Sequence, residues 1–331
     1  MDVHALGWIA LAAIILTMIT IDVVGHVRTP HEPSMREAAV WSAAYIAMAC
    51  VFGAVVWAVW GGRYGQEYFA GYITEKALSI DNLFVFVIML TAFRVPRAYQ
   101  QEVLLAGIVI ALVLRLVFIL AGAALVERFG VVFYVFGALL IGTAVRQVVD
   151  ARRPDGPDDG AEYADNAVTR LVRRVLPTTD GFVGNRLIHR HAGRTMITPM
   201  LIAVVALGSA DLMFAVDSIP AIFGLTSEPF LVFSATAFSL LGLRQLYFLI
   251  DGLLERLVYL PYGLAVILGF IGLKLIDHAL RVNSLPLING GRPVELVPEP
   301  STAVSLLVIV VTLAVVAVAS LLRTRRRGGR R

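Results

Sequence analysis

The sequence predicts an all-α polytopic membrane protein with about nine transmembrane helices and a core of two inverted three-helix repeats. Three observations support this prediction. Of the 331 residues, 58% are hydrophobic, and a mean hydropathy of +0.80 is too high for a soluble domain. The apolar residues form runs of about 20, which as helices would cross about 30 Å of hydrocarbon. An acidic pattern also occurs twice, each time inside such a run.

Nine stretches are long and apolar enough to span a membrane. The first lacks a basic leader and a small-residue cleavage site, so we expect a retained helix and not a signal peptide. The stretches cover residues 6–24, 38–60, 70–92, 103–125, 129–149, 197–223, 230–250, 256–279 and 302–322.

These stretches organise the chain as one membrane domain, 1–331, in five segments. The loop between the repeats opens with ARRPDGPDDGAEYADN, and its second half, TRLVRRVLP, favours a short amphipathic helix on the inner leaflet. The segments are two flanking helices (1–69), the first repeat (70–149), a cytoplasmic loop (150–196), the second repeat (197–280), and an outer loop, last helix and basic cytoplasmic tail (281–331).

The basic residues predict the orientation of the chain. With the N-terminus outside, 20 of the 28 Lys and Arg fall in cytoplasmic segments. Because positively charged loops are retained in the cytoplasm, we expect a protein of the inner (cytoplasmic) membrane with its N-terminus outside and its C-terminus in the cytoplasm. The net charge of +4 then reflects topology and attraction of the loop and tail to anionic lipid, not nucleic-acid binding.

The acidic pattern is an acid, five residues, a second acid and a polar residue. A carboxylate at the centre of a membrane helix costs about 2.5–3.5 kcal/mol, so four of them indicate a functional site. A shift of 136 positions aligns the first copy with the second. Because each repeat has three helices, an odd number, the second copy must enter the membrane from the opposite side. The copies are Glu75, Asp81 and Asn82 in GYITEKALSIDNLFVFVIML, and Asp211, Asp217 and Ser218 in LIAVVALGSADLMFAVDSIPAIFGL.

The charges of this pattern favour a divalent cation near the bilayer midplane. Four carboxylates carry −4, and one arginine per repeat, Arg115 in LRLVFIL and Arg244 in LRQLYFL, returns +2. The core keeps −2, which one divalent cation or two protons would neutralise. We expect Arg115 and Arg244 each to contact an acid of the core, because an unpaired guanidinium in hydrocarbon is as costly as an unpaired carboxylate.

The candidate ligands are oxygen atoms, with no Cys or His in either motif. Such sites favour Mn²⁺, Mg²⁺ or Ca²⁺ over Zn²⁺, and the sequence does not choose among the first three. Pro220 would free the carbonyl of Val216, a further ligand if the helix is broken there. Asp22, near the inner end of the first helix, is either a ligand for a cation on its way into the protein or a snorkelling helix end.

Two motifs, TEKALSIDNLFVFV and SADLMFAVDSIPAIFGLTSEP, resemble those of the TerC family of integral membrane proteins, named for tellurium resistance. IDVVGH, EAAVWSAAY, LRLVFILAGAALVERF and LGLRQLYFLI extend the resemblance over nearly the whole chain. It implies a lysine-exporter-like fold with bacterial relatives that export manganese. It also implies a metal-coordinating role for Glu75, Asp81, Asp211 and Asp217. Many relatives carry a glutamate three residues before Asp211, where this chain has Gly208.

The leading hypothesis is therefore a secondary transporter that exports a divalent cation, Mn²⁺ first, without a permanent cofactor and with homo-oligomerisation left open. No P-loop motif is present, and no nucleophile and base pair indicates an enzyme. The alternative is a membrane scaffold or assembly factor that docks partners through its loop and tail, since relatives are linked to tellurite resistance and to thylakoid membrane-protein assembly. The single Cys50 permits no internal disulfide, and we expect it in the core.

Overall fold

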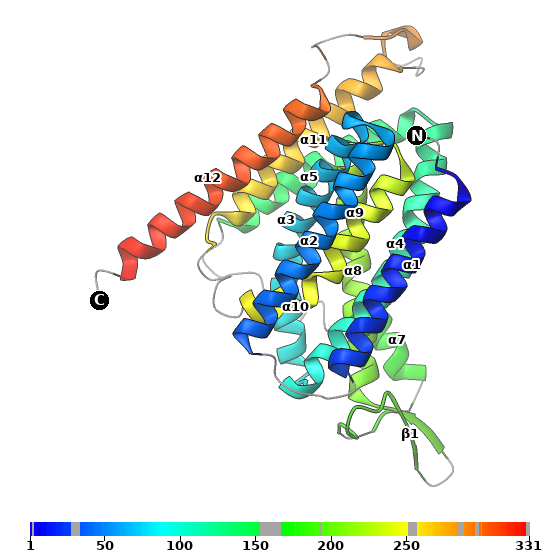
Figure 1. Ribbon diagram of the computed structural model, residues 1–331, viewed down its shortest axis with the longest axis vertical. Helices are drawn as coiled ribbons and strands as arrows, with labels where there is room; N and C mark the ends of the chain where they lie inside the picture. Colours follow the sequence, from blue (N-terminus) through cyan, green and yellow to red (C-terminus); the bar gives the residue numbers. More distant parts are fainter. Residues whose placement is uncertain are drawn as a thin grey trace.

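The structure is a computed structural model, and it describes residues 1, 3–27, 34–152, 167–175, 177–179, 181–191, 194–250, 257–283, 288–294, 298 and 300–328. Helices make up nearly all of it (Figure 1). The elements are α1 (Ala5–Asp22), its π-helical continuation η1 (Val23–Val27), α2 (Met35–Trp60), α3 (Gly62–Ala92), α4 (Arg97–Arg128), α5 (Val131–Asp150), α7 (Ala167–Val175), β1 (Ile188–His191), β2 (Arg194–Ile197), α8 (Pro199–Phe223), α9 (Pro229–Leu241), α10 (Leu243–Ile250), α11 (Leu260–Arg281), the short 3₁₀ helix η3 (Asn289–Gly291) and α12 (Thr302–Gly328).

Local sequence signals set several of these boundaries. Ser34 caps α2 by accepting a hydrogen bond from the backbone N–H of Glu37 at 3.2 Å. Pro199 and Pro229 each open a helix, a position where the missing N–H costs nothing. Gly61 separates α2 from α3 at φ +98°, a conformation that other residues rarely adopt.

The predicted all-α polytopic membrane fold is confirmed. Within the described residues, eight helices are long and apolar enough to cross a membrane. The ninth predicted span, 70–92, forms the second part of α3, a 31-residue helix that is more polar because it carries Glu75, Lys76 and Asp81. The eight spans are Ala5–Gly25, Met35–Trp60, Arg97–Arg128, Val131–Asp150, Pro199–Phe223, Pro229–Leu249, Leu260–Arg281 and Thr302–Arg323.

The helix interruption in the second repeat lies elsewhere than expected. α8 continues through Pro220 to Phe223, because the proline sits in the last turn and removes only one hydrogen bond near the helix end. The predicted span 230–250 still forms one candidate span, Pro229–Leu249, but its helix is interrupted at Gly242, between α9 and α10. The carbonyl of Ser239, in the last turn of α9, accepts a hydrogen bond from Lys76 Nζ at 3.2 Å.

Contacts between the two repeats follow a twofold pattern. The first helices, α3 and α8, pack on each other, and so do the second helices, α4 and α9, and the third, α5 and α11. The first helix of each repeat also packs on the second helix of the other, as α3 on α9 and α4 on α8. This reciprocal pairing is what two inverted three-helix units predict.

The α5–α11 contact depends on two glycines. A Cβ at Gly137 would lie 2.8 Å from the carbonyl oxygen of Gly272, and a Cβ at Gly272 would lie 3.0 Å from that of Gly137. Small residues of this kind let membrane helices approach closely.

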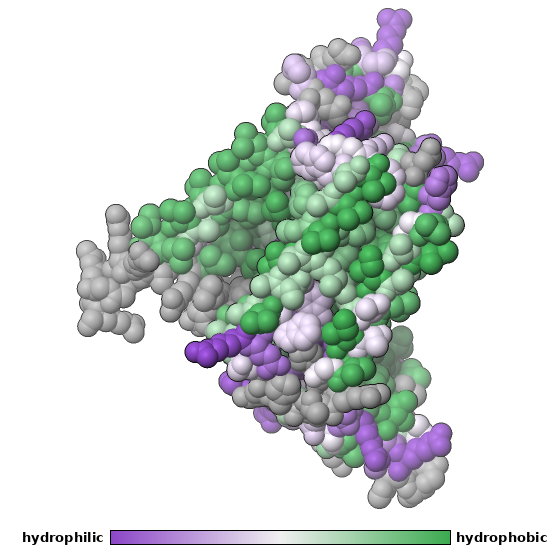
Figure 2. Space-filling view, in the orientation of Figure 1, coloured by the Kyte–Doolittle hydropathy of each residue, from purple (hydrophilic) through white to green (hydrophobic). Residues whose placement is uncertain are grey.

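The two ends of the bundle differ. α7 and the antiparallel β1–β2 hairpin lie at the end opposite the N-terminus, and the sequence did not predict the hairpin (Figure 1). α12 runs obliquely away from the bundle (Figure 1). α7 confirms the short helix expected in TRLVRRVLP. Figure 2 shows apolar side chains along the flanks of the helices and polar ones gathered at the ends. Cys50 belongs to the exposed flank of α2, so its expected core position is wrong.

Candidate functional site

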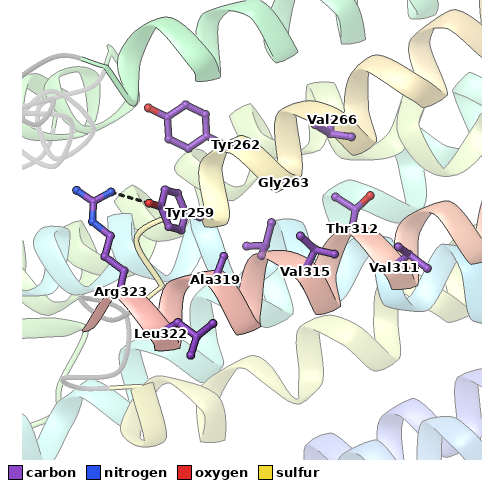
Figure 3. Close-up of a pocket in the computed structure, with 11 residues that line it drawn as sticks. Tyr259, Tyr262, Gly263, Val266, Val311, Thr312, Val315, Ala319, Leu322 and Arg323 are labelled. Atoms are coloured by element: carbon purple, nitrogen blue, oxygen red, sulfur yellow. Dashed lines mark hydrogen bonds between the residues drawn. The ribbon is translucent and has the colours of Figure 1, made fainter. Parts of the chain in front are cut away.

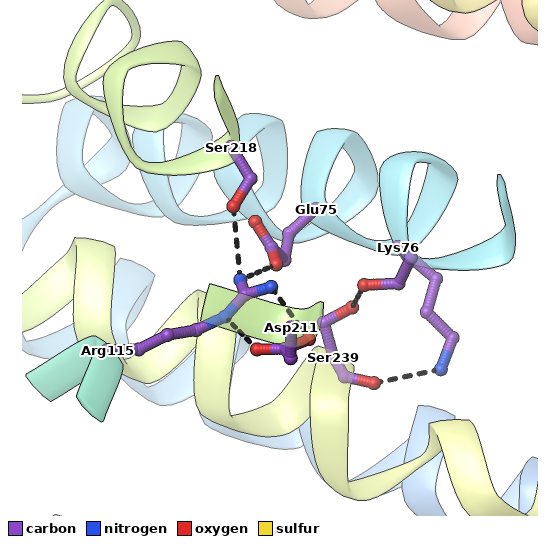
Figure 4. Close-up of polar contacts among 7 residues, drawn as sticks. Glu75, Lys76, Arg115, Asp211, Ser218 and Ser239 are labelled. Atoms are coloured by element: carbon purple, nitrogen blue, oxygen red, sulfur yellow. Dashed lines mark hydrogen bonds and ion pairs between the residues drawn. The ribbon is translucent and has the colours of Figure 1, made fainter. Parts of the chain in front are cut away.

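A buried arginine joins the two repeats. Arg115, on α4, has a fully buried side chain. Its Nε donates to Asp211 Oδ2 at 2.8 Å and its Nη2 to Asp211 Oδ1 at 3.2 Å, a bidentate pair. Its Nη1 donates to Ser218 Oγ at 3.1 Å and also to Glu75 Oε1 (Figure 4). The guanidinium therefore lies between α3 of the first repeat and α8 of the second.

Charge in this cluster is incompletely balanced. Glu75 and Asp211 are 0% and 2% exposed, and one guanidinium faces two carboxylates. If all are ionised, the cluster keeps a charge of −1. Oε2 of Glu75 is buried and has no hydrogen-bond partner among the described residues. A bare carboxylate oxygen in a buried site is unfavourable and is available to a further cation.

The second acid of each copy has surroundings different from those of the first. Asp81 accepts a hydrogen bond from Gln147 Nε2 of α5 at 3.0 Å. Six residues on a helix correspond to about 9 Å and 120°, so Asp81 faces a different neighbour from Glu75. Asn82, beside it, is half-buried. Asp217 is half-buried on α8 and interacts electrostatically with Glu75 and Arg115.

The four acids consequently do not converge as expected. The described part of the chain holds no group of three or more His, Cys, Asp and Glu side chains placed to hold a metal ion. The physical reason is that Arg115 occupies the space between Glu75 and Asp211, and that the helical twist turns Asp81 toward α5. Of the predicted residues, the structure brings together Glu75, Asp211, Ser218 and Arg115.

Arg244 pairs outside the repeated acids, so its expected contact with the core acids is not made. Its Nη2 donates to Asp22 Oδ1 at 2.6 Å, and both side chains are 1% exposed. Asp22 thus lies in a buried ion pair between α1 and α10, beside Tyr45 of α2, and not at an open mouth. The reason is that Arg244 is the second residue of α10, a helix that packs against α2.

Sequence reasoning missed a polar group beside the cluster. Ser79 and Ser239 are fully buried with their Oγ atoms 3.5 Å apart, and Lys76 donates to the Ser239 carbonyl (Figure 4). A Cβ at Gly242 would lie 2.9 Å from Lys76 Nζ. Lys76 inside a hydrophobic run and next to Glu75 was the one signal that could have found this group.

Gly208 marks a close contact of α4 with α8. A Cβ there would lie 2.9 Å from Cγ2 of Ile110. An acid at this position, one turn before Asp211, would have to displace Ile110. In this chain, the side chain of Ile110 therefore fills the space beside residue 208 that an acid would need.

A polar cavity of about 530 Å³ opens at the N-terminal end of the bundle. Glu67, 3% exposed in its wall, accepts hydrogen bonds from Thr226 Oγ1 at 2.7 Å and Arg63 Nε at 2.9 Å. Glu67 precedes Glu75 by eight residues of α3, about 12 Å along the helix. The cavity therefore approaches the buried cluster from one side.

Comparisons with known proteins identify several relatives of this chain. No solved structure matches it significantly. An uncharacterized membrane protein of Mycobacterium tuberculosis (strain H37Rv) is 48% identical over 329 residues, 99% of this chain and 82% of the relative. A membrane protein of Myxococcus xanthus is 40% identical over 268 residues, 81% of this chain and 82% of the relative.

A further relative carries a functional name. The "Putative membrane-bound redox modulator Alx" of Escherichia coli (strain K12) is 35% identical over 278 residues, 81% of this chain and 85% of the relative. The sequence profile described as "Integral membrane protein TerC family" matches residues 60–328. The chain belongs to the TerC family of integral membrane proteins.

Proposed function

We propose that this protein is a secondary transporter that exports a divalent cation, with Mn²⁺ as the first candidate, and that Arg115 holds the place of the cation in the empty carrier. The observation that carries the proposal is the buried cluster of Glu75, Arg115, Asp211 and Ser218 where the two repeats meet. Intramembrane ionisable groups at a repeat interface are typical of substrate and ion pathways.

Charge supports a divalent cargo. Glu75 and Asp211 together carry −2, and Arg115 supplies +1. A divalent cation in place of the guanidinium would bring the cluster to neutrality. Binding would then be an exchange of one cation for another inside the protein, and the buried Oε2 of Glu75 offers it a vacant acceptor.

Ligand chemistry supports a hard or intermediate ion. The acceptors at the cluster are two carboxylates and the hydroxyl of Ser218. Oxygen donors favour Mn²⁺, Mg²⁺ and Ca²⁺, whereas Zn²⁺ is better served by imidazole and thiolate. Asp217 already interacts electrostatically with Glu75 and Arg115, whereas Asp81 would join the ligands only after a helix movement, because it is hydrogen-bonded to Gln147 of α5.

The same arrangement explains how an empty carrier could cycle. Two uncompensated carboxylates in a low-dielectric core would resist the rearrangement that exposes the site to the other side. Arg115 compensates one of them when no metal is bound. The cavity beside Glu67 would be the route on the N-terminal side, which we propose to be the outside on the basis of the arginine distribution.

The test is metal content of cells with and without the protein, measured for Mn, Mg, Ca, Zn and Fe after a metal load. We expect lower cell-associated Mn with the wild-type protein and no such effect with Glu75→Gln. Glu127→Gln, an exposed acid on α4, is the matched control and should behave as wild type. Equal Mn content with wild type and Glu75→Gln, at equal membrane abundance, would refute the proposal.

A second candidate, redox modulation, follows from the name of the Escherichia coli relative. The chain has one cysteine, so a dithiol–disulfide couple cannot form within it. A redox role of the chain's own thiol would therefore rest on Cys50, exposed on α2. If Cys50→Ser abolished the effect of the protein on the cells and Glu75→Gln retained it, the result would favour this candidate over cation export.

A further inference from the structure

A long groove lies between α11 and α12. It encloses about 1140 Å³ and lies on the membrane-facing side of both helices, since Val266, Val315 and Leu322 in its walls are each more than half exposed. Figure 3 shows Thr312, Val315, Ala319 and Arg323 of α12 directed toward α11. The lining residues are Tyr259, Tyr262, Gly263, Val266, Val311, Thr312, Val315, Val316, Ala319, Leu322 and Arg323.

Polar groups gather at one end of this groove. Arg323 Nη1 donates to the Tyr259 hydroxyl at 3.0 Å, and its guanidinium stacks 5.2 Å from the centre of the Tyr259 ring. The Tyr262 hydroxyl donates to the carbonyl of Ala151, just beyond α5, at 3.3 Å. From there toward Val311 the walls are aliphatic apart from Thr312. The groove is thus amphipathic along its length.

The dimensions correspond to one leaflet of a bilayer. Val311 and Arg323 are twelve residues apart on α12, or about 18 Å. One leaflet contributes about half of the ~30 Å hydrocarbon core. With Arg323 at the headgroup level, as expected for an arginine that snorkels from a helix end, the aliphatic walls would extend to near the midplane.

We propose that this groove binds one anionic phospholipid, with an acyl chain along α11 and α12 and the phosphate at Arg323 and the two tyrosines. Charge complementarity selects this occupant. A guanidinium has five N–H donors and matches phosphate geometry, and among the described residues Tyr259 accepts one of them. Five further arginines follow Arg323 in the sequence, and a cluster of basic residues attracts anionic headgroups.

The lipid would act as a wedge between α12 and the core. α11 contacts α5 of the first repeat and α12 at the same time. α12 approaches α11 closely at Gly263, where a Cβ would lie 2.6 Å from Val316 Cγ2. A bound chain therefore fixes the separation of the two helices on either side of that contact. Lipid binding in this groove does not depend on cation export.

The test is lipid retention by the full-length chain. Protein is purified from membranes that contain equal amounts of phosphatidylglycerol and phosphatidylethanolamine, and native mass spectrometry counts the lipids kept after mild delipidation. We expect one phosphatidylglycerol per wild-type chain. Ala319→Trp, which fills the groove, should reduce retention about tenfold. Arg323→Gln should abolish the preference for the anionic lipid.

Matched controls separate this site from general lipid coating. Val318→Trp adds the same ring to an exposed position of α12 outside the groove, and Arg146→Gln removes a charge from an exposed side chain at the same end of the bundle. Both should retain lipid as wild type does. Equal losses in controls and groove variants would overturn the proposal. So would a wild-type dimer that Ala319→Trp dissociates, because a second copy would then be the occupant.

Discussion

At the scale of single residues, the cluster around Arg115 is the feature that most constrains function. One cation serves two acids that come from equivalent helices of the two repeats. Removing one partner of a buried ion pair typically costs about 3–5 kcal/mol because the other charge is left uncompensated. The cluster therefore holds the two repeats together by ion pairs, and it also keeps a net charge of −1 when both acids are ionised.

Arg115→Gln separates these two roles. It removes the internal competitor, so we expect Mn²⁺ to bind about tenfold more tightly while turnover falls, because the empty carrier loses its compensating charge. The variant should be less stable without metal, and added Mn²⁺ should raise its melting temperature more than that of the wild type. Calorimetric binding and thermal unfolding of purified protein measure both effects. An unchanged affinity together with wild-type turnover would show that Arg115 does not compete with the cargo.

The acids and the arginine were predictable as site residues because charges are rare in membrane helices. Their partners were only partly predictable. Arg115 contacts core acids as expected, but Asp81 meets Gln147 and Arg244 meets Asp22. The sequence states which residues need a partner, whereas the choice of partner depends on how helices rotate and pack.

At the scale of elements, the buried pair between α1 and α10 fixes a flanking helix to the core. Asp22→Ala leaves Arg244 unpaired, so we expect a loss of about 3–5 kcal/mol in stability. Replacing both, as Asp22→Leu with Arg244→Met, should recover most of it because apolar groups of similar size need no partner. Thermal unfolding midpoints in detergent measure this.

The pair of exposed Arg146 and half-buried Asp150, at 3.4 Å, is the control for that cycle. Asp150→Ala should change stability by less than about 1 kcal/mol, since exposed ion pairs contribute little. A double variant no more stable than Asp22→Ala would indicate that Asp22 and Arg244 have roles beyond pairing with each other.

The α5–α11 contact gives a second test at this scale. Gly137→Ala would place a methyl group against the Gly272 carbonyl, and we expect a loss of about 1–3 kcal/mol from overpacking. Gly142→Ala, on the same helix with no atom within 4 Å of its Cβ, should be neutral or stabilising by up to about 1 kcal/mol. Comparable destabilisation of both variants would argue that helix propensity, and not the close approach, decides the effect.

Helix positions were predictable from hydropathy, but two details of the elements were not. At the division at Gly242, the Ser239 carbonyl accepts a hydrogen bond from Lys76 of α3, 163 residues away in sequence. Pro220 was a stronger local signal, yet its place in the last turn of α8 leaves the helix continuous. Local breakers identify where a helix can be interrupted, and tertiary contacts decide where it is.

At the scale of the whole molecule, the reciprocal contacts between the repeats and the distribution of arginines predict a membrane topology with the C-terminus in the cytoplasm. We expect a reporter fused after Arg331 to be active only in the cytoplasm and a cysteine introduced at Asn289, in the outer loop, to be labelled by an impermeant thiol reagent from outside. The labelling uses a Cys50→Ser background. Labelling of position 289 only after membranes are opened would reverse the orientation and, with it, the proposed direction of transport.

The central claim is that Glu75 and Asp211 hold one divalent cation in place of Arg115, and equilibrium Mn²⁺ binding to the purified full-length protein tests it most directly. We expect one Mn²⁺ per chain, bound about a hundredfold more weakly in Glu75→Gln and in Asp211→Asn and unchanged in Glu127→Gln. Wild-type Mn²⁺ affinity in folded Glu75→Gln and Asp211→Asn would contradict the account.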